Sequence, residues 1–163
     1  MTVSTRLEHL CDLSRDEATA ELLRCCGSTT WANLVADARP FGSEVELDQA
    51  AARAFDALKR EDWLDAFAAH PRIGDRARGW EAHEQAGVAS AQQQTLERLA
   101  ERNAEYEQRF GHVYLICASG RSADEMLTAL EARIDNDPET ELTNAAHEQR
   151  AITKLRLQKW LSE

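Results

Sequence analysis

Three serines in this chain are each followed, three residues later, by a glutamate, and each pair precedes a run with helical periodicity. The pairs are Ser14 with Glu17, Ser43 with Glu46, and Ser122 with Glu125. At this spacing the serine side chain can accept a hydrogen bond from the glutamate N–H, and the glutamate side chain can reach back to the serine N–H. Apolar residues recur every three or four positions after each pair. The sequence therefore predicts three capped helices.

Further helices are predicted from apolar spacing and from residues that end a helix. Beyond the capped helices, the predicted ranges are about 29–38, 62–70, 90–110 and 139–161, with a short helix or turn over 80–87 and a loop over 74–79. Gly27 is well placed to end the first capped helix and Gly111 to end the helix over 90–110. Pro138 suits the first position of the last helix.

One short stretch, residues 113–118, has a strand-like composition between Gly111 and Gly120. The sequence holds no second run of that kind to pair with it, so we expect an extended, buried segment. Its backbone N–H and C=O groups must still find partners, and a bound polar ligand could supply one. The fold predicted over residues 1–163 is therefore all-α: a single-domain multi-helix bundle with one short extended buried segment.

The charge balance of the chain argues against nucleic acid as a partner. Its 19 basic and 29 acidic residues give a formal net charge of −10, which a polyanion would repel. No stretch approaches the roughly 20 apolar residues that a membrane span needs. None of the four cysteines stands in a C-x-x-C pair, so we interpret them as buried, reduced thiols. With no apolar run of signal length near the N-terminus, the prediction is a soluble, cytoplasmic protein.

The stretch from His70 and Pro71 through Asp75 organises the middle of the chain. Proline disfavours the helical conformation in the residue before it, so the helix that leads to His70 is expected to end at about that residue. A stiff turn directly after a histidine can hold its imidazole still as a general acid or base. The alternative is a helix end whose histidine only faces water.

Metal-binding and cofactor-binding patterns are absent from the sequence. None of the five histidines forms an i, i+4 pair, and there is no glycine-rich phosphate loop, so we expect no metal and no cofactor. The remaining candidates are His70, Glu84, Gln85 and Arg156, which supply an acid–base group, a carboxylate, an amide and a cation. Such a set suits proton transfer on a small, polar, anionic substrate. For Arg156, a long side chain that lies along the surface is the alternative.

Several short motifs, in this order and at these spacings, carry a family resemblance over nearly the whole chain. They are Cys25-Cys26-Gly27-Ser28, Arg39-Pro40-Phe41, Asp62-Trp63-Leu64, His70-Pro71-Arg72-Ile73-Gly74-Asp75, Glu84-Gln85-Ala86-Gly87, Asn136-Asp137-Pro138-Glu139 and Leu155-Arg156-Leu157. The chain resembles the 2-oxo-4-hydroxy-4-carboxy-5-ureidoimidazoline (OHCU) decarboxylases, which complete the conversion of urate to allantoin. The resemblance implies an all-α fold, an active site without a cofactor, and a homodimer. It also allows for functional coupling to the upstream enzymes that oxidise urate and hydrolyse 5-hydroxyisourate.

The resemblance assigns roles to individual residues of this chain. His70, Glu84 and Arg156 match catalytic positions, and His70 has the leading role. The substrate-binding positions are matched by Pro71, Glu81, Gln85, Leu115, Ile116 and Cys117, the last three through the backbone. The implied reaction is decarboxylation of the small molecule OHCU to (S)-allantoin and CO₂, the last step of the urate-to-allantoin pathway.

Glu81 departs from the family pattern, in which serine often stands three residues before the motif glutamate. A longer, negatively charged side chain could contact the substrate, turn outward, or pair with Arg76 or Arg78. Two other functions also stay open. One is a cofactor-free lyase or hydrolase that acts on a related ureido compound, and the other is a helical interaction module that has lost catalysis.

Overall fold

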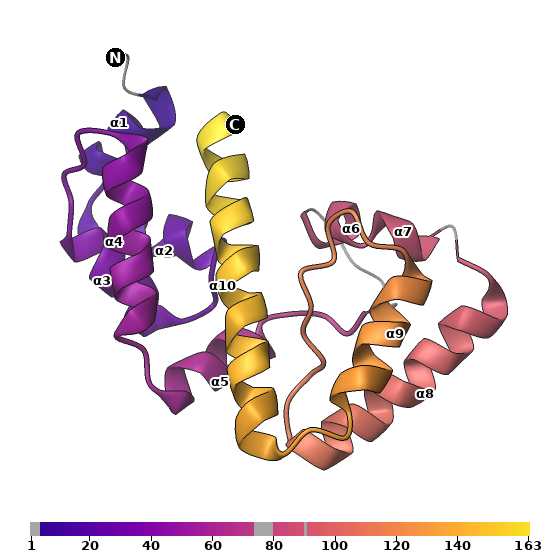
Figure 1. Ribbon diagram of the computed structural model, residues 1–163. Coiled ribbons are helices and arrows are strands. Elements are labelled where there is room, and N and C mark those ends of the chain that lie inside the picture. Colours follow the sequence, from indigo (N-terminus) through magenta and orange to yellow (C-terminus); the bar gives the residue numbers. More distant parts are fainter. Residues whose placement is uncertain (1–3, 74–79, 90) are drawn as a thin grey trace. The chain divides into compact units, whose positions relative to one another are not determined.

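The computed structural model describes residues 4–73, 80–89 and 91–163, which form helices and connecting segments but no strand (Figure 1). In chain order the helices are α1 (Thr5–Asp12), α2 (Arg15–Leu23), α3 (Thr29–Asp37), α4 (Glu44–Asp56), α5 (Arg60–Ala68), α6 (Trp80–Glu84), α7 (Ala86–Ala89), α8 (Gln93–Phe110), α9 (Ala123–Arg133) and α10 (Pro138–Ser162). The predicted all-α fold is confirmed. Within the described ranges, no helix is long and apolar enough to cross a membrane. The loop predicted over 74–79 lies outside the described residues.

Contacts within the chain divide it into two compact units. The first unit combines Met1–Ala66 with Arg150–Glu163, and the second unit is Phe67–Gln149. Helix α10 contributes residues to both units because the division falls within it. The single-domain organisation predicted over residues 1–163 is not tested by this division and stays a prediction.

Two tryptophans fill the core of the first unit. Trp31 on α3 is 0% exposed and Trp160 near the end of α10 is 2% exposed. Both indole N–H groups have partners: Trp31 donates to the Ala51 carbonyl at 3.1 Å, and Trp160 donates to the Glu21 carboxylate at 2.9 Å. Because these bonds tie α3 to α4 and α10 to α2, the tryptophans fix the helices as well as filling the space between them.

The second unit is built around α8 and α9, which pack against each other. The chain between these helices runs extended over residues 113–118 (Figure 1). Tyr114, Leu115 and Ile116 are buried there, so the predicted extended, buried segment is confirmed. The hydrophobic core of this unit includes Leu99, Tyr106, Tyr114, Met126 and Leu130.

The serine–glutamate pairs cap their helices as predicted. Ser14 and Ser122 each form a complete capping box at the start of α2 and α9. Ser43 caps α4 by accepting a hydrogen bond from the Glu46 N–H at 3.2 Å, but the Glu46 side chain accepts from the Gly42 N–H instead. Each cap satisfies backbone N–H groups that a helix start leaves without partners.

The two predicted glycine stops have different outcomes. Gly111 ends α8 as predicted, and the structure shows it in the left-handed conformation, with φ of 78°. The predicted role of Gly27 is wrong, because α2 already ends at Leu23. The N–H groups of the two cysteines that follow both bond back to the Leu22 carbonyl, so a tight turn closes the helix before the glycine is reached.

Candidate active site

His70 stands at the end of α5, as its proline neighbour predicts. The helix ends at Ala68, and the His70 N–H bonds back to the Phe67 carbonyl at 3.1 Å in a last tight turn. Pro71 then takes the chain out of the helix. The imidazole is half-buried. The alternative of a helix end whose histidine only faces water therefore does not describe His70.

The turn after His70 is anchored to α8. Arg72 forms a two-point ion pair with Glu107, at 2.6 and 3.0 Å, and the Asn103 side chain donates to the Ile73 carbonyl at 3.0 Å. Asn103 and Ile73 are both buried. The motif residues after Pro71 therefore fix the backbone that carries the histidine.

A residue that sequence reasoning missed, Gln149, holds the His70 ring. The Gln149 side chain on α10 is 0% exposed, and its Oε1 lies 2.7 Å from Nε2 of His70. The missed signal was the position of this glutamine within the apolar stripe of the last helix. It follows the buried Ala145 by four residues and precedes the buried Ile152 by three. A polar residue in such a stripe needs a hydrogen-bonding partner.

Side chains supply partners for the backbone of the extended segment. The Leu115 carbonyl accepts a hydrogen bond from Arg133 at 2.9 Å. The Cys117 N–H donates to Glu148 at 3.2 Å, and the Cys117 carbonyl accepts from Arg121 at 3.1 Å. Since Glu148 directly precedes Gln149, α10 holds both this segment and the His70 ring.

The short helices α6 and α7 carry the acid–amide pair. Glu84 ends α6, Gln85 links it to α7, and both side chains are half-buried, as is Glu81. Gly87 lies so close to the turn before α9 that a Cβ atom there would stand 2.4 Å from the Arg121 carbonyl oxygen. Glycine at this position therefore lets α7 approach the turn before α9.

The charges of Glu84 and Glu148 both affect the pKa of the Cys117 thiol. Burial raises the pKa of the Cys117 thiol, and the negative charges of Glu148 and Glu84 raise it further. Cys117 is thus held as a neutral thiol, which is unfavourable for a nucleophile. In the part of the chain that the structure describes, no three His, Cys, Asp or Glu side chains gather as a metal-binding group.

Arg156 belongs to the first unit and is only 6% exposed. The alternative of an arginine lying along the surface is therefore wrong for this residue. Its neighbours include two buried thiols: burial raises the pKa of Cys25 to about 12, and the charge of Arg156 opposes this rise at both Cys25 and Cys26. Burial of a guanidinium costs free energy unless the group is paired. A buried arginine at this position therefore indicates a residue with a specific role.

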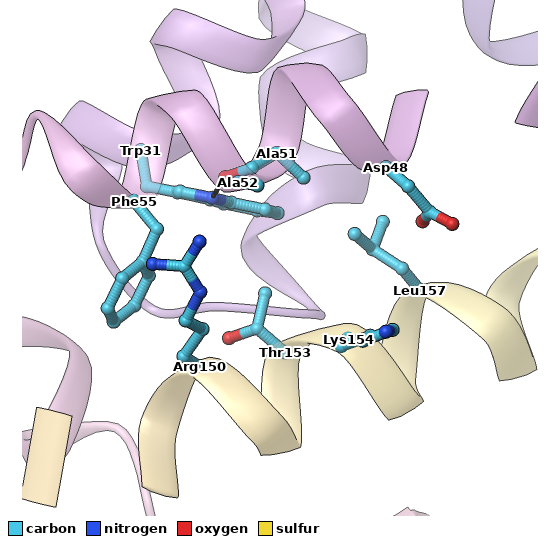
Figure 2. A pocket seen from close by; sticks show the side chains of 9 residues that line it. All are labelled: Trp31, Asp48, Ala51, Ala52, Phe55, Arg150, Thr153, Lys154 and Leu157. Carbon is cyan, nitrogen blue, oxygen red and sulfur yellow. Dashed lines mark hydrogen bonds between the residues drawn. The ribbon is translucent and has the colours of Figure 1, made fainter. Parts of the chain in front are cut away.

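A separate cavity of about 200 Å³ lies within the first unit (Figure 2). Its wall consists of Trp31, Asp48, Ala51, Ala52, Phe55, Arg150, Thr153, Lys154 and Leu157, none of which is a predicted site residue. Arg150 is held at one end by an ion pair with Asp56. On α10, the residues that line this cavity share one face of the helix. The centre of that face is rotated by about 100° around the helix axis from the positions of Gln149 and Arg156.

A family model described as OHCU decarboxylase matches residues 12–158. This range contains every residue of the candidate site. The chain belongs to the OHCU decarboxylase family. The resemblance inferred from the sequence motifs is thereby confirmed.

Solved structures share the fold of this member of the OHCU decarboxylase family. A crystal structure of OHCU decarboxylase in the presence of (S)-allantoin is 39% identical, with a TM-score of 0.80 over 88% of this chain and 98% of that one. A crystal structure of (S)-allantoin synthase, 21% identical, has the same fold, with a TM-score of 0.72 over 94% of this chain and 53% of that one.

Curated relatives differ in length from this family member. The uric acid degradation bifunctional protein TTL of Arabidopsis thaliana is 38% identical over 148 residues, which are 85% of this chain and 46% of that protein. The 2-oxo-4-hydroxy-4-carboxy-5-ureidoimidazoline decarboxylase of Haloferax volcanii is 35% identical over 127 residues, or 73% of each chain. The chain thus spans about half of the Arabidopsis protein.

Proposed function

We propose that this chain catalyses the cofactor-free decarboxylation of OHCU to (S)-allantoin and CO₂. The observation that carries this proposal is the family match over residues 12–158. The candidate site supports it, because a fixed imidazole stands in the same unit as carboxylate and amide side chains and an extended backbone segment. These groups suit a small substrate with several hydrogen-bonding positions.

The substrate itself can accept the electron pair that is released when its C–CO₂ bond breaks. One ring carbon carries both the carboxylate and the hydroxyl, and it adjoins a ring C=N bond. When the C–CO₂ bond breaks, its electron pair passes into that C=N bond, so the reaction does not need the electron sink that many decarboxylases take from a cofactor. The ring nitrogen of the former C=N bond takes up a proton. The hydroxyl then loses its proton to become a carbonyl, and the neighbouring carbon gains one. Overall, the anionic substrate takes up one proton and releases CO₂.

His70 acts in proton transfer in the hydroxyl and carboxylate region. Its ring position is fixed by the Gln149 contact at 2.7 Å and by the turn that begins at Pro71. A positioned acid–base group typically contributes about 10²–10⁴-fold in rate. Delivery of the proton to one face of the intermediate yields one enantiomer of the product.

The other site residues bind and orient the substrate. Glu84 and Gln85 bind its ring or ureido N–H groups, and Arg156 pairs with its anionic end. Further contacts come from Pro71, Glu81 and the backbone of Leu115, Ile116 and Cys117.

The test generates OHCU in situ from urate with the upstream enzymes and follows the circular dichroism of the allantoin formed. The wild-type chain should rapidly produce one enantiomer, and a folded His70→Ala variant should be slower by at least about 10²-fold. Ala52→Leu, which enlarges a side chain in the separate cavity of the first unit (Figure 2), should retain activity.

Three results would contradict the proposal. Racemic allantoin at the spontaneous rate would indicate a helical module without catalysis. A different product in the NMR spectrum would indicate a lyase or hydrolase for a related ureido compound. Turnover near the wild-type rate in a folded His70→Ala variant would remove His70 from the mechanism.

We also propose that the protein is a cytoplasmic homodimer that is functionally coupled to the enzymes upstream. The family resemblance supports the dimer. The coupling is supported by relatives in Arabidopsis thaliana and Bacillus subtilis, whose names describe bifunctional proteins of uric acid degradation. Light scattering should give twice the mass of one chain, and the mass of a single chain would refute the dimer.

A further inference from the structure

The amide of Gln149 stands inside the second unit, where an apolar side chain would be expected. It lies on α10 between the buried Ala145 and Ile152, and it is itself fully buried. Its Oε1 faces Nε2 of His70 at 2.7 Å, which is a short hydrogen bond for a nitrogen donor. Burial at this depth keeps water from replacing the amide as the partner of the ring.

We propose that Gln149 is a positioning residue that holds His70 in the tautomer with a proton on Nε2. This inference rests on the proposed role of His70 in decarboxylation. An amide oxygen can only accept a hydrogen bond, so the ring nitrogen that faces it must donate. When Nε2 carries the proton of the neutral ring, the basic lone pair is on Nδ1. Nδ1 is therefore the atom through which His70 takes up and releases a proton.

A glutamine suits this role better than the carboxylate beside it. Glutamine is uncharged, so it orients the ring without the attraction by which a carboxylate stabilises the imidazolium form. The adjacent Glu148 has its carboxylate turned to the backbone N–H of Cys117, at 3.2 Å. The charges of Glu148 and Glu84 both act on the Cys117 thiol of the extended segment. Helix α10 thus presents an amide to the imidazole and a carboxylate to the extended segment.

The experiment compares variants that remove or keep the acceptor. Gln149→Met has a similar length without an acceptor, and Gln149→Glu keeps an acceptor but adds a charge. Gln158→Met is the matched control, because Gln158 is an exposed glutamine on the same helix. Tautomers are read from the ¹⁵N shifts of the His70 ring in protein labelled at histidine, and kcat and KM are measured with OHCU.

In the wild type we expect neutral His70 with its proton on Nε2. Gln149→Met should give a mixture of tautomers and lower kcat by about 10²-fold, as for a misplaced catalytic group, with a much smaller change in KM. Gln149→Glu should restore the Nε2 proton and part of kcat, and should move the acid limb of the pH profile to higher pH. Gln158→Met should match the wild type in every measurement.

The two proposals fail in different ways. A proton on Nδ1 in the wild type would overturn the inference, and so would a Gln149→Met variant with unchanged tautomer and kcat. Because the tautomer is measured without substrate, a chain that has the Nε2 proton but does not decarboxylate OHCU would contradict the proposed function instead. If Gln149→Met does not fold, the wild-type spectrum and Gln149→Glu still decide the tautomer.

Discussion

Replacement of the buried Glu141 by glutamine should destabilise the second unit more than any surface substitution. The Glu141 carboxylate is 0% exposed and accepts hydrogen bonds from the Tyr106 hydroxyl at 2.5 Å and from Arg133 Nε at 2.8 Å. Asn136 and Asn144 donate to its second oxygen at 3.2 and 3.3 Å. These four groups are all donors, which an amide cannot satisfy on both sides.

The magnitude follows from the uncompensated charge that the substitution leaves behind. Glu141→Gln keeps the size of the side chain but leaves Arg133, whose side chain is only 12% exposed, without its counter-charge. Removal of one partner from a buried ion pair typically costs about 3–5 kcal/mol. In a chain of this length, that loss lowers Tm by about 6–20 °C.

The same substitution should also reduce activity. Arg133 donates to the Leu115 carbonyl at 2.9 Å, and its guanidinium lies 5.0 Å from the centre of the Tyr114 ring. Glu141 therefore positions the arginine that holds the extended segment. Once the ion pair is lost, we expect kcat for OHCU to fall even at temperatures where the variant is folded.

The pH dependence of stability gives a second measure of the same network. Burial alone would raise the pKa of Glu141, but hydrogen bonds from Arg133 and Tyr106 outweigh burial and lower it below its usual value. A carboxyl whose pKa is lower in the folded state stabilises that state above its unfolded pKa of about 4.3. This stability is lost as the pH falls through the folded pKa. Wild type should therefore lose more stability on acidification below about pH 5 than Glu141→Gln does.

The assay is thermal and urea unfolding followed by far-UV circular dichroism at pH 7. Glu139→Gln, at an exposed position on the same helix, is the matched control and should change stability by less than about 0.5 kcal/mol. The double variant Arg133→Met with Glu141→Leu should cost less than the sum of the two single changes, because neither charge is left alone. A Glu141→Gln variant within about 1 kcal/mol of wild type would refute the reasoning.

Two further substitutions test local features. Gly87→Ala would place a Cβ atom 2.4 Å from the Arg121 carbonyl oxygen, so we expect a loss of about 1–3 kcal/mol in thermal unfolding and a lower kcat for OHCU; a Tm at or above that of wild type would contradict the close approach. Ser122→Ala removes the capping box of α9 and should cost about 1 kcal/mol, whereas Ser122→Gly should cost only a few tenths. Equal stability of these two serine variants would show that the cap does not stabilise α9.

Features that depend on a few neighbouring residues could be predicted from the sequence. The caps at Ser14 and Ser122, the helix stop at Gly111 and the helix end before Pro71 were all predicted correctly. Each depends on contacts within about one helical turn, and the sequence contains all the participants. The prediction for Gly27 was wrong because the residues just before it form a competing turn, and this turn ends the helix first.

Long-range partners could not be predicted in the same way. His70 was a candidate because of its own neighbours, but its partner Gln149 stands 79 residues away. Likewise, the predicted extended segment needed backbone partners, and Arg133 and Glu148 supply them from two different helices. A single sequence shows which groups need partners but not which distant residue provides them.

Helix α10 shows why periodicity alone misses such a site. Its buried positions include four polar residues, namely Glu141, Gln149, Thr153 and Arg156. At 3.6 residues per turn these four fall on one broad face, which apolar spacing would assign to the core. Burial of polar groups is costly unless each finds a partner, and Glu141 and Gln149 find theirs in Arg133 and His70. Polar residues at core positions of a long helix therefore indicate functional or network positions, and on this helix the rule selects Glu141, Gln149, Thr153 and Arg156.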